Sequence, residues 1–540
     1  MDMERQDKDT AGIVGLKTHF EGPEGCPESC VVEPSRVGQH RVLEAIPGAL
    51  VWATLISAVF LSYFAPLVVM YFILLFDLYW LFRVCYFVFY LTISWRRYRR
   101  AIRVDWLAKA RSLPRFDDIH HLIFLPTYKE DLSILRSTFR SLASSAYPVR
   151  ERFIVVLAGE ERDREHFLKN AAALREEFGD SFFLLVTSLH PRDLPGELPG
   201  KGSNIHWTGH QVRKLVDQLG LPYDDVIVSS FDVDTCAHPQ YFACLTHTYL
   251  THPNPTRSSY QPVALYNNNM WDSPSVVRVA AFGTTFWLLS ELARPERLFT
   301  FSSHSMPFRA LVDVGFWEKD IVTEDSRIFL QCLLRYNGDY TVTPIYLPVS
   351  MDTVMADTYW RSIVNLYKQQ RRWAWGVEHF PYLVARFRNL PQFPWRKKIY
   401  HIWTLLEGMY SWATVPLLIF LLGYLPLWLA SDTVRVGVLY QNLPHVLETL
   451  MRLSMLGIFI SAVLGFGLLP PRPSGKRRYV SLVMLLQWIL VPITFVVFGS
   501  FPAIDAQTRL MFGRYLGFNV TEKRRKQALR TDMAPAPDRS

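Results

Sequence analysis

An uncharged apolar run extends from Ala45 to Ala65. A helix needs about 20 such residues to cross the hydrocarbon layer of a bilayer. A second run, Leu67–Trp95, contains only Asp77 and Arg83 as charged residues, and it closes with Trp95-Arg-Arg-Tyr-Arg-Arg100. An aromatic residue followed by arginines is typical of the cytosolic border of a membrane. We therefore expect two membrane-spanning helices, with the chain in the cytosol after Arg100.

The two charges inside the second run need an explanation, because charged side chains are costly within a membrane. Asp77 and Arg83 are spaced so that we expect them close to the same side of the helix. They can form an internal ion pair in a helix bundle or line a polar path, and the sequence leaves both interpretations open.

Basic residues return at Trp395-Arg-Lys-Lys398, and three further apolar stretches follow, at Tyr400–Ala430, Leu453–Leu469 and Tyr479–Phe501. The loop 472–478 and the tail 523–526 are both basic. The positive-inside rule places both in the cytosol, which one crossing between them cannot satisfy. We expect either two short helices in the first stretch or a hairpin in the last, with about six crossings in total.

The composition agrees with a membrane protein that carries a soluble domain. Half of the residues are hydrophobic and 20% are charged, which excludes a disordered chain. The six cysteines include no CxxC pair and predict free thiols in a reducing compartment. The expected parts are a polar N-terminal tail (1–44), two transmembrane helices (45–100), a cytosolic domain (101–360), amphipathic interface helices (361–398), C-terminal transmembrane helices (399–503) and a cytosolic tail (504–540).

The net charge of +9 raises the question of a nucleic-acid partner. The cationic runs lie at the expected membrane borders, where anionic lipid headgroups account for them. We therefore expect membrane lipids as partners and no nucleic acid.

In the cytosolic domain, apolar runs of strand length alternate with longer amphipathic segments. Such alternation predicts βαβ units with a mostly parallel sheet, and ligands bind at the carboxyl ends of the strands of such a sheet. The residues at those ends are 127–131, 159–161 and 232–234. The expected strands are 120–128, 152–158, 181–188 and 225–234, and the expected helices are 133–145, 164–178 and 211–219.

The strand that ends in Phe231-Asp-Val-Asp234 places two carboxylates one residue apart, where the period of a strand points them the same way. Hard oxygen donors of this kind can share a Mg²⁺ or Mn²⁺ ion that also binds a diphosphate. Solvated carboxylates at the end of a strand are the alternative reading.

A second acidic motif is Thr323-Glu324-Asp325, which comes directly before a helical pattern. Thr323 is placed to cap that helix, and acidic residues in a first turn suit the helix dipole. In the functional interpretation, Asp325 is a general base that takes a proton from an attacking hydroxyl.

The third motif is Lys368-Gln-Gln-Arg-Arg-Trp373, in which Gln369, Arg372 and Trp373 share one helix face. A basic, tryptophan-rich helix near a membrane is often an interfacial anchor. Alternatively, the arginine neutralises a departing diphosphate and the indole stacks on a sugar ring.

Taken in order, FLPTYKED, FDVD, IVTED and QQRRW between two groups of membrane helices resemble the membrane-embedded family 2 glycosyltransferases, the cellulose, chitin and hyaluronan synthase type. The resemblance implies an α/β GT-A domain, Rossmann-like with a mostly parallel sheet, inserted between transmembrane helices. It also implies inverting transfer from a nucleotide-sugar donor, usually a UDP-sugar, with Mg²⁺ or Mn²⁺. The expected location is the plasma membrane, with the catalytic domain in the cytosol.

The resemblance also implies roles for single residues. Asp325, with Glu324 and Thr323, corresponds to the catalytic motif, and Asp232 and Asp234 correspond to the metal and diphosphate carboxylates. Trp373 corresponds to the acceptor site. The residues that correspond to donor-binding positions are Thr127, Tyr128, Glu130, Lys201, Asn204, Asp232, Gln369 and Arg372.

The chain departs from the family pattern at two places. Where the family has an aspartate pair that holds the base, this chain reads Val156-Leu-Ala-Gly-Glu-Glu161, and Glu160 is the expected substitute. Where the family has its acceptor loop, this chain reads Phe301-Ser-Ser-His-Ser-Met306. His304 there either touches an acceptor or is a polar loop residue.

Three functions are consistent with this pattern of motifs. The first is a synthase that polymerises sugar and passes the chain through its own helices, and the second is an enzyme that transfers one sugar to a lipid-linked or membrane acceptor. The third is a non-catalytic transporter or scaffold, which the intact motifs disfavour. The sequence leaves the sugar, the linkage, the acceptor and the oligomeric state open.

Overall fold

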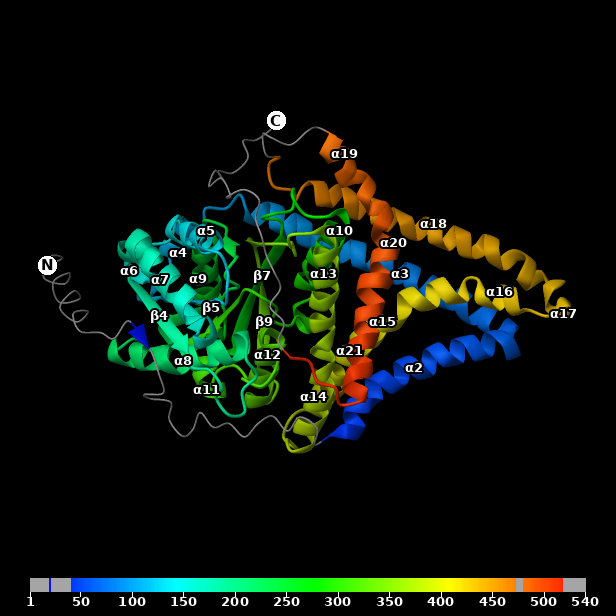
Figure 1. Cartoon of the computed structure of the whole chain (residues 1–540), viewed down its shortest axis with the longest axis horizontal. Helices are drawn as coiled ribbons and strands as arrows, with labels where there is room; N and C mark the ends of the chain where they lie inside the picture. Colours follow the sequence, from blue (N-terminus) through cyan, green and yellow to red (C-terminus); the bar gives the residue numbers. More distant parts are fainter. Residues whose placement is uncertain (1–18, 21–39, 473–478, 518–540) are drawn as a thin grey trace, which may run out of the picture.

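An α/β domain occupies one end of the molecule, and a bundle of long helices projects from it (Figure 1). The structure, a computed structural model, describes residues 19–20, 40–472 and 479–517. Most of the expected N-terminal tail, most of the basic loop 472–478 and the basic residues 523–526 lie outside the described residues.

The domain is built on one sheet, with the strand order β1-β4-β3-β2-β5-β8-β7-β9-β6. Neighbouring strands are parallel from β1 to β5 and between β7 and β9, while β8 and β6 pair antiparallel to their neighbours. This confirms the expected α/β domain with a mostly parallel sheet. The strands are β1 (His19–Phe20), β2 (His120–Pro126), β3 (Phe153–Glu160), β4 (Leu184–His190), β5 (Val226–Ser230), β6 (Cys236–Ala237), β7 (Ser258–Tyr266), β8 (His304–Pro307) and β9 (Thr341–Met351).

Helices cover both faces of the sheet because its central strands are apolar on both sides. Leu122 and Phe124 of β2 lie in one core cluster, with side chains of α8 (Lys201–Gln218), α11 (Phe308–Val314) and α12 (Glu324–Arg335). Ile123 and Leu125, which point the other way, lie in a second cluster. That cluster includes side chains of α5 (Leu132–Ala143), α7 (Arg164–Phe178) and α9 (Tyr241–Thr251).

Helix α8 begins at Lys201, well before the expected start at Gln211. The missed half contains two glycines, which normally weaken a helix. Here they allow close packing: a Cβ added at Gly209 would lie 2.4 Å from the ring of Phe316, and one at Gly202 would lie 3.1 Å from the carbonyl oxygen of Glu318. The early start brings Lys201 to the carboxyl edge of the sheet.

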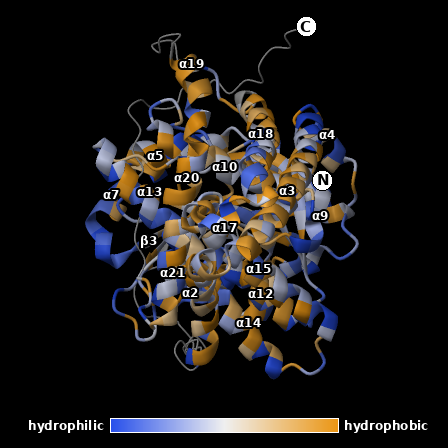
Figure 2. Cartoon of the chain, turned by 90° about the vertical axis from the view of Figure 1, so that its right-hand side faces the viewer, coloured by the Kyte–Doolittle hydropathy of each residue, from blue (hydrophilic) through white to orange (hydrophobic). Residues whose placement is uncertain are grey.

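Five helical segments are long and apolar enough to cross a membrane within the described part of the chain, compared with the six crossings expected. They are α2 (Arg41–Phe64), α3 (Pro66–Ala101), α15 (Trp395–Leu422), Val438–Gly465 within α18 (Val438–Phe466), and Leu482–Met511. Figure 2, which faces the projecting end, shows much of the ribbon of these helices in orange, the colour of hydrophobic residues. The stretch 400–430 thus contains one long helix, followed by the short α16 (Leu425–Leu429), rather than two short helices.

Helix α18 begins earlier than the expected Leu453. Glu448 and Arg452 interrupt the apolar run there, but the two side chains pair at 2.5 Å one turn apart. Such a pair supports the helix and allows it to continue across both charges.

The last segment consists of α19 (Tyr479–Leu486), η9 (Gln487–Leu490), α20 (Val491–Thr494), the π-helical η10 (Phe495–Ser500) and α21 (Phe501–Met511), and it forms no hairpin. Near its start, the ring of Trp488 stacks on Phe286 of α10 (Ser275–Leu292), with the centroids 5.7 Å apart. At its end, Arg41, the first residue of α2, donates hydrogen bonds to the carbonyls of Leu510 (3.1 Å) and Met511 (2.7 Å). Both ends therefore lie on the domain side of the bundle, and Figure 1 shows the segment running across the other long helices.

The two charges of α3 do not pair with each other. Arg83 instead donates a hydrogen bond to Glu407 of α15 at 3.1 Å. Helical geometry explains the correction, because residues at this spacing lie about a third of a turn apart around the helix. Asp77 is buried, and its Oδ1 has no hydrogen-bond partner among the described residues.

Candidate active site

The Asp-Val-Asp motif follows β5, but its two carboxylates lie in different environments. The strand ends at Ser230, so residues 231–234 do not keep the alternation of a strand that the sequence predicts. The side chain of Asp232 is 28% exposed, whereas Asp234 is fully buried. Asp234 Oδ2 accepts a hydrogen bond from the backbone N–H of Asp352 at 2.8 Å. Asp232 is therefore the carboxylate of this motif that a ligand reaches first.

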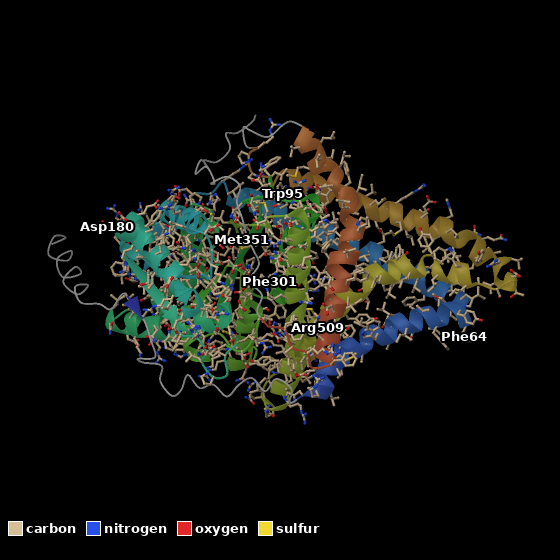
Figure 3. The ribbon with its side chains drawn as sticks, viewed as in Figure 1. Phe64, Trp95, Asp180, Phe301, Met351 and Arg509 are labelled. Atoms are coloured by element: carbon tan, nitrogen blue, oxygen red, sulfur yellow. The ribbon has the colours of Figure 1, made fainter. Side chains whose placement is uncertain are left out.

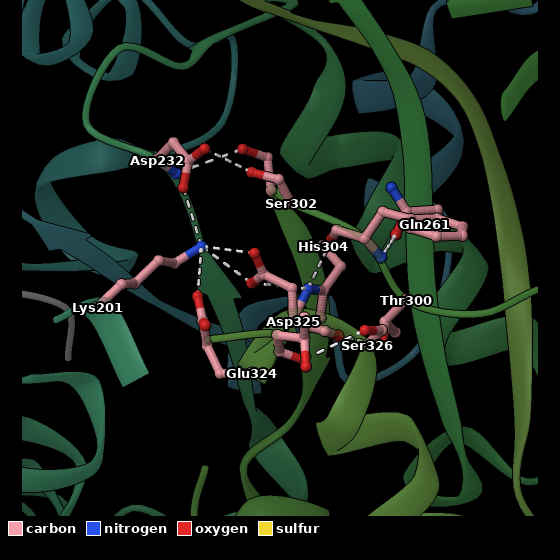
Figure 4. A network of polar contacts seen from close by, with 12 residues as sticks. Lys201, Asp232, Gln261, Thr300, Ser302, His304, Glu324, Asp325 and Ser326 are labelled. Carbon is pink, nitrogen blue, oxygen red and sulfur yellow. Dashed lines mark hydrogen bonds and ion pairs between the residues drawn. The ribbon is translucent and has the colours of Figure 1, made fainter. Parts of the chain in front are cut away.

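Lys201 joins the acidic motifs (Figure 4). Its Nζ lies 2.9 Å from Asp232 Oδ1 and 2.9 Å from both carboxylate oxygens of Asp325. Glu324 Oε1 is 3.8 Å from the same nitrogen. One ammonium group thus faces three carboxylates that come from two separate motifs. Since Lys201 begins α8 and the acidic pair begins α12, the site is formed where two helices start beside the sheet edge.

The excess of negative charge shifts the pKa values of the site. Burial lowers the pKa of Lys201, but Asp232, Asp325 and Glu324 together raise it well above its ordinary value. Burial and the neighbouring Asp325 raise the pKa of Glu324 to about 8, against the opposing charges of Lys201 and Arg372. The site therefore favours a bound cation or proton.

Ser302 and His304 complete the surroundings of the two partly exposed carboxylates, those of Asp232 and Asp325. Ser302 Oγ donates a hydrogen bond to Asp232 Oδ2 at 2.7 Å. His304 lies on β8 rather than in a loop, is fully buried, and has its Nδ1 2.9 Å from the carbonyl of Phe301 and 3.9 Å from Asp325 Oδ1. Its ring lies behind Asp325 and has no exposed surface.

Thr323 occupies the N-cap position of α12 but makes no side-chain cap hydrogen bond with the described residues. Its hydroxyl donates instead to Oε1 of Glu378, a residue of η8 (Trp375–Glu378). The expected position was thus correct, and the expected capping bond was wrong.

The loop after β2 is held by Glu130, whose Oε2 accepts hydrogen bonds from Thr127 Oγ1 (2.8 Å) and from the backbone N–H of Tyr128 (2.5 Å). Asn204 is buried and donates to the carbonyl of Ala158, at the end of β3, at 2.8 Å. Both contacts shape the loops at the carboxyl edge of the sheet.

Glu160, at the end of β3, pairs with Arg162, whose Nε donates a hydrogen bond at 2.8 Å. The guanidinium of Arg162 lies over the ring of Tyr128, 4.6 Å from its centroid. Glu160 and Arg162 line a surface hollow together with His190 and Glu197. Arg162 is not among the residues predicted from the sequence, although its position directly after the end of β3 was a signal.

Helix α13 (Tyr359–Ala374) carries the QQRRW motif along the other side of the site. Gln369 and Trp373 line a hollow that also includes Tyr266 and Asp352, and the rings of Trp373 and Tyr266 are 6.0 Å apart between centroids. The predicted shared face is therefore directed at the sheet edge.

No group of three or more histidine, cysteine or acidic side chains suited to a metal occurs among the described residues. Mg²⁺ commonly takes one or two protein carboxylates and completes its coordination with water and substrate phosphates. The partly exposed carboxylate of Asp232 fits such a sparse site.

A model of a known protein family matches the part of the chain that contains these motifs. Residues 227–443 match the family model described as "Glycosyl transferase family group 2", and this range includes the DVD, TED and QQRRW motifs. No curated protein matches the chain.

Two solved structures are similar in part. They are S. aureus TarS 1-349 (12% identity, TM-score 0.32, covering 64% of this chain and 90% of that chain) and S. aureus TarS (11%, 0.29, 64% and 55%). These TM-scores are too low to bear on fold or function. The family match, together with the mostly parallel GT-A-like sheet and five apolar helices, supports a family 2 glycosyltransferase associated with a membrane.

Proposed function

We propose that this chain is an inverting glycosyltransferase that uses a nucleotide-sugar donor, a UDP-sugar, to build a polysaccharide and pass it across a membrane. The observation that carries the proposal is the position of Lys201 Nζ, 2.9 Å from both Asp232 and Asp325. This contact joins two motifs that serve donor and acceptor in the family the sequence resembles. We also propose that the protein lies in the plasma membrane, with its catalytic domain in the cytosol.

In the proposed reaction, Asp325 accepts the proton of an acceptor hydroxyl while that oxygen attacks the anomeric carbon. The bond from this carbon to the nucleotide diphosphate breaks, so the configuration inverts. Lys201 and Arg372 stabilise the negative charge that develops on the leaving diphosphate. The carboxylates of Asp325 and Asp232 share one ammonium, which supports a base and a leaving-group site side by side.

A divalent Mg²⁺ or Mn²⁺ ion held by Asp232 and Asp234 would supply further positive charge to the diphosphate. Asp232 fits this role as it stands, because its carboxylate is partly exposed. The buried Asp234 fixes the same turn through its bond to the Asp352 N–H, so its contribution is the less direct one.

Donor binding is assigned to the carboxyl edge of the sheet. The Tyr128 ring beneath Arg162, with Glu160 beside them, offers a stacking face and polar groups for a nucleobase. Thr127, Glu130 and Asn204 hold the loops beside the surface hollow that Glu160 and Arg162 line. These contacts support the assignment of five of the predicted residues to the donor side. They are Thr127, Tyr128, Glu130, Glu160 and Asn204.

Acceptor binding is assigned to Trp373, in the hollow that it lines with Tyr266. Gln369 lines the same hollow and keeps its assignment to the donor side. An indole face suits a sugar ring. His304 has no exposed surface, so we propose that it acts behind Asp325 rather than on the acceptor itself.

The test is nucleotide release by the detergent-solubilised protein with a panel of nucleotide sugars and Mg²⁺ or Mn²⁺. Asp325→Asn is expected to lower turnover by about 10²- to 10⁴-fold and to leave donor binding intact. Asp180→Asn is the matched control, because Asp180 lies on the far end of the domain (Figure 3). A long glycan product supports a polymerising synthase, whereas a single-sugar lipid product favours transfer to a lipid carrier. Equal turnover in both variants contradicts the assignment of the base.

A further inference from the structure

The segment directly after the QQRRW motif is in contact with the first turn of α12. Oε1 of Glu378 accepts a hydrogen bond from Thr323 Oγ1, and Oε2 accepts one from the buried indole N–H of Trp375 at 2.8 Å. Burial raises the pKa of Glu378, and the charge of Arg327 opposes the shift. Glu378 thus ties the residue two positions before Asp325 to η8.

The next residue, His379, holds the other side of the same turn. Its Nδ1 accepts a hydrogen bond from Arg327 Nε at 3.1 Å, so the ring proton belongs on Nε2. Nε2 lies 2.8 Å from Ser326 Oγ, which itself donates to the carbonyl of Thr323 at 3.2 Å. Burial, together with the charge of Arg327, lowers the pKa of His379 well below its ordinary value, which keeps the ring neutral.

Arg327 anchors this network in the protein interior. Its NH1 nitrogen donates to Glu318 Oε2 at 2.8 Å, and its guanidinium lies 3.8 Å from the ring centroid of Tyr382. The arginine is almost completely buried. A buried, paired charge of this kind fixes the orientation of the groups around it, because moving one of them weakens the pairing of the charge.

The contacts bracket the proposed base without touching it. Asp325 lies between Thr323, which is bound to Glu378, and Ser326, which is bound to His379. Within the described part of the chain, helix α12 has no side-chain cap at this end, so these contacts supply the support that a cap gives elsewhere.

The same contacts lead back to the QQRRW motif. The backbone of Trp375 stays helical, and its N–H donates to the carbonyl of Arg371, so η8 continues α13 without a loop. Arg372 and Trp373 are therefore rigidly connected to Glu378 and His379.

We propose that Glu378 and His379 are positioning residues that set Asp325 at a fixed distance from Arg372 and Trp373. The inference rests on the proposed function and assigns to it two residues outside the four motifs. An error of about 1 Å in the relative position of a base and its reactants can lower the rate about 100-fold. The effect belongs to the chemical step, because neither residue reaches the donor side of the site.

The test compares Glu378→Ala, which removes both acceptors, with Glu378→Gln, which retains one oxygen acceptor. Glu291→Gln is the matched control, because Glu291 is also buried and ion-paired, with Arg294 and Arg297, but lies on α10 away from this turn. We expect Glu378→Ala to lower kcat by about 10- to 100-fold and Glu378→Gln by less, with the donor KM changed by less than about threefold. Hydrogen exchange of residues 321–328 should become faster in Glu378→Ala and not in the control.

If Glu378→Ala does not fold, His379→Ala replaces it, because it removes only the contacts to Ser326 and Arg327. Faster exchange in 321–328 with unchanged kcat overturns the proposal, since the contacts would then be structural only. A loss of kcat equal to that of Glu291→Gln also overturns it. A wild-type protein that transfers no sugar contradicts the proposed function instead, and the exchange measurement still decides whether Glu378 holds α12.

Discussion

Replacing Lys201 by methionine tests the charge balance of the site directly, because methionine keeps the length of the side chain and removes its charge. At an effective dielectric constant of 20, each carboxylate at 2.9 Å attracts the ammonium by about 6 kcal/mol. The cost of burying these charges offsets much of this attraction. Removing one partner of a buried ion pair typically costs about 3–5 kcal/mol, and we expect Lys201→Met to lower the free energy of unfolding by this amount.

The assay is thermal unfolding of the detergent-solubilised protein at pH 8, with EDTA present so that no divalent ion takes the place of the ammonium. A loss of about 3–5 kcal/mol corresponds to a fall in Tm of about 6–20 °C for a domain of this size. Lys319→Met is the matched control, because Lys319 is similarly buried and lies 3.3 Å from the carboxylate of Glu197, outside the Asp232–Asp325 site. We expect a smaller fall for this variant.

The pH dependence provides a second check on Lys201→Met. The folded-state pKa of Glu324 is raised to about 8, above its unfolded value, so the ionised carboxylate costs stability as the pH rises through that range. Without the ammonium this cost grows, and protonation of Glu324 removes it. The stability difference between variant and wild type should therefore shrink from pH 8 to pH 5. A Tm within about 2 °C of wild type at pH 8, or a difference that grows towards pH 5, would refute the electrostatic reasoning.

Two other substitutions test how the site is held in place. Asp505→Asn weakens the ion pair that links α21 to Arg371 of α13 (2.8 Å) and the pair with Arg509 within α21 (2.6 Å), so we expect a loss of about 1.5–3 kcal/mol in thermal unfolding and a lower kcat; an unchanged kcat would show that α13 needs no support from α21. Gly209→Ala places a Cβ 2.4 Å from the Phe316 ring, and we expect a loss of about 1–3 kcal/mol by the same assay; a more stable variant would contradict the close approach of α8.

The strands of the domain were predictable because their apolar runs are continuous and short. The runs that contain Leu122, Val155 and Val228 all form strands within a few residues of the expected limits. The start of α8 was not predictable, because the need for glycine at Gly209 arises from Phe316, which is distant in the sequence.

The three acidic and aromatic motifs were recognisable from their residues, but their contacts were not. The spacing of Asp232 and Asp325 in the sequence gives no sign that one ammonium bonds to both. Glu378 and His379 were not predicted for a similar reason, since a Glu-His pair after a tryptophan-rich helix has no local signature. Only the contacts of Glu378 with Thr323 and of His379 with Ser326 show what the pair holds.

The path of the last apolar segment changes the expected number of membrane passes. Because its two ends both lie beside the domain-side ends of its neighbours, we expect this segment to run in the plane of the membrane surface rather than through it. Four transmembrane passes then remain, and an even number returns the chain to the side on which it started. The basic residues at 96–100 and 396–398 would then face the same compartment, as the positive-inside rule requires.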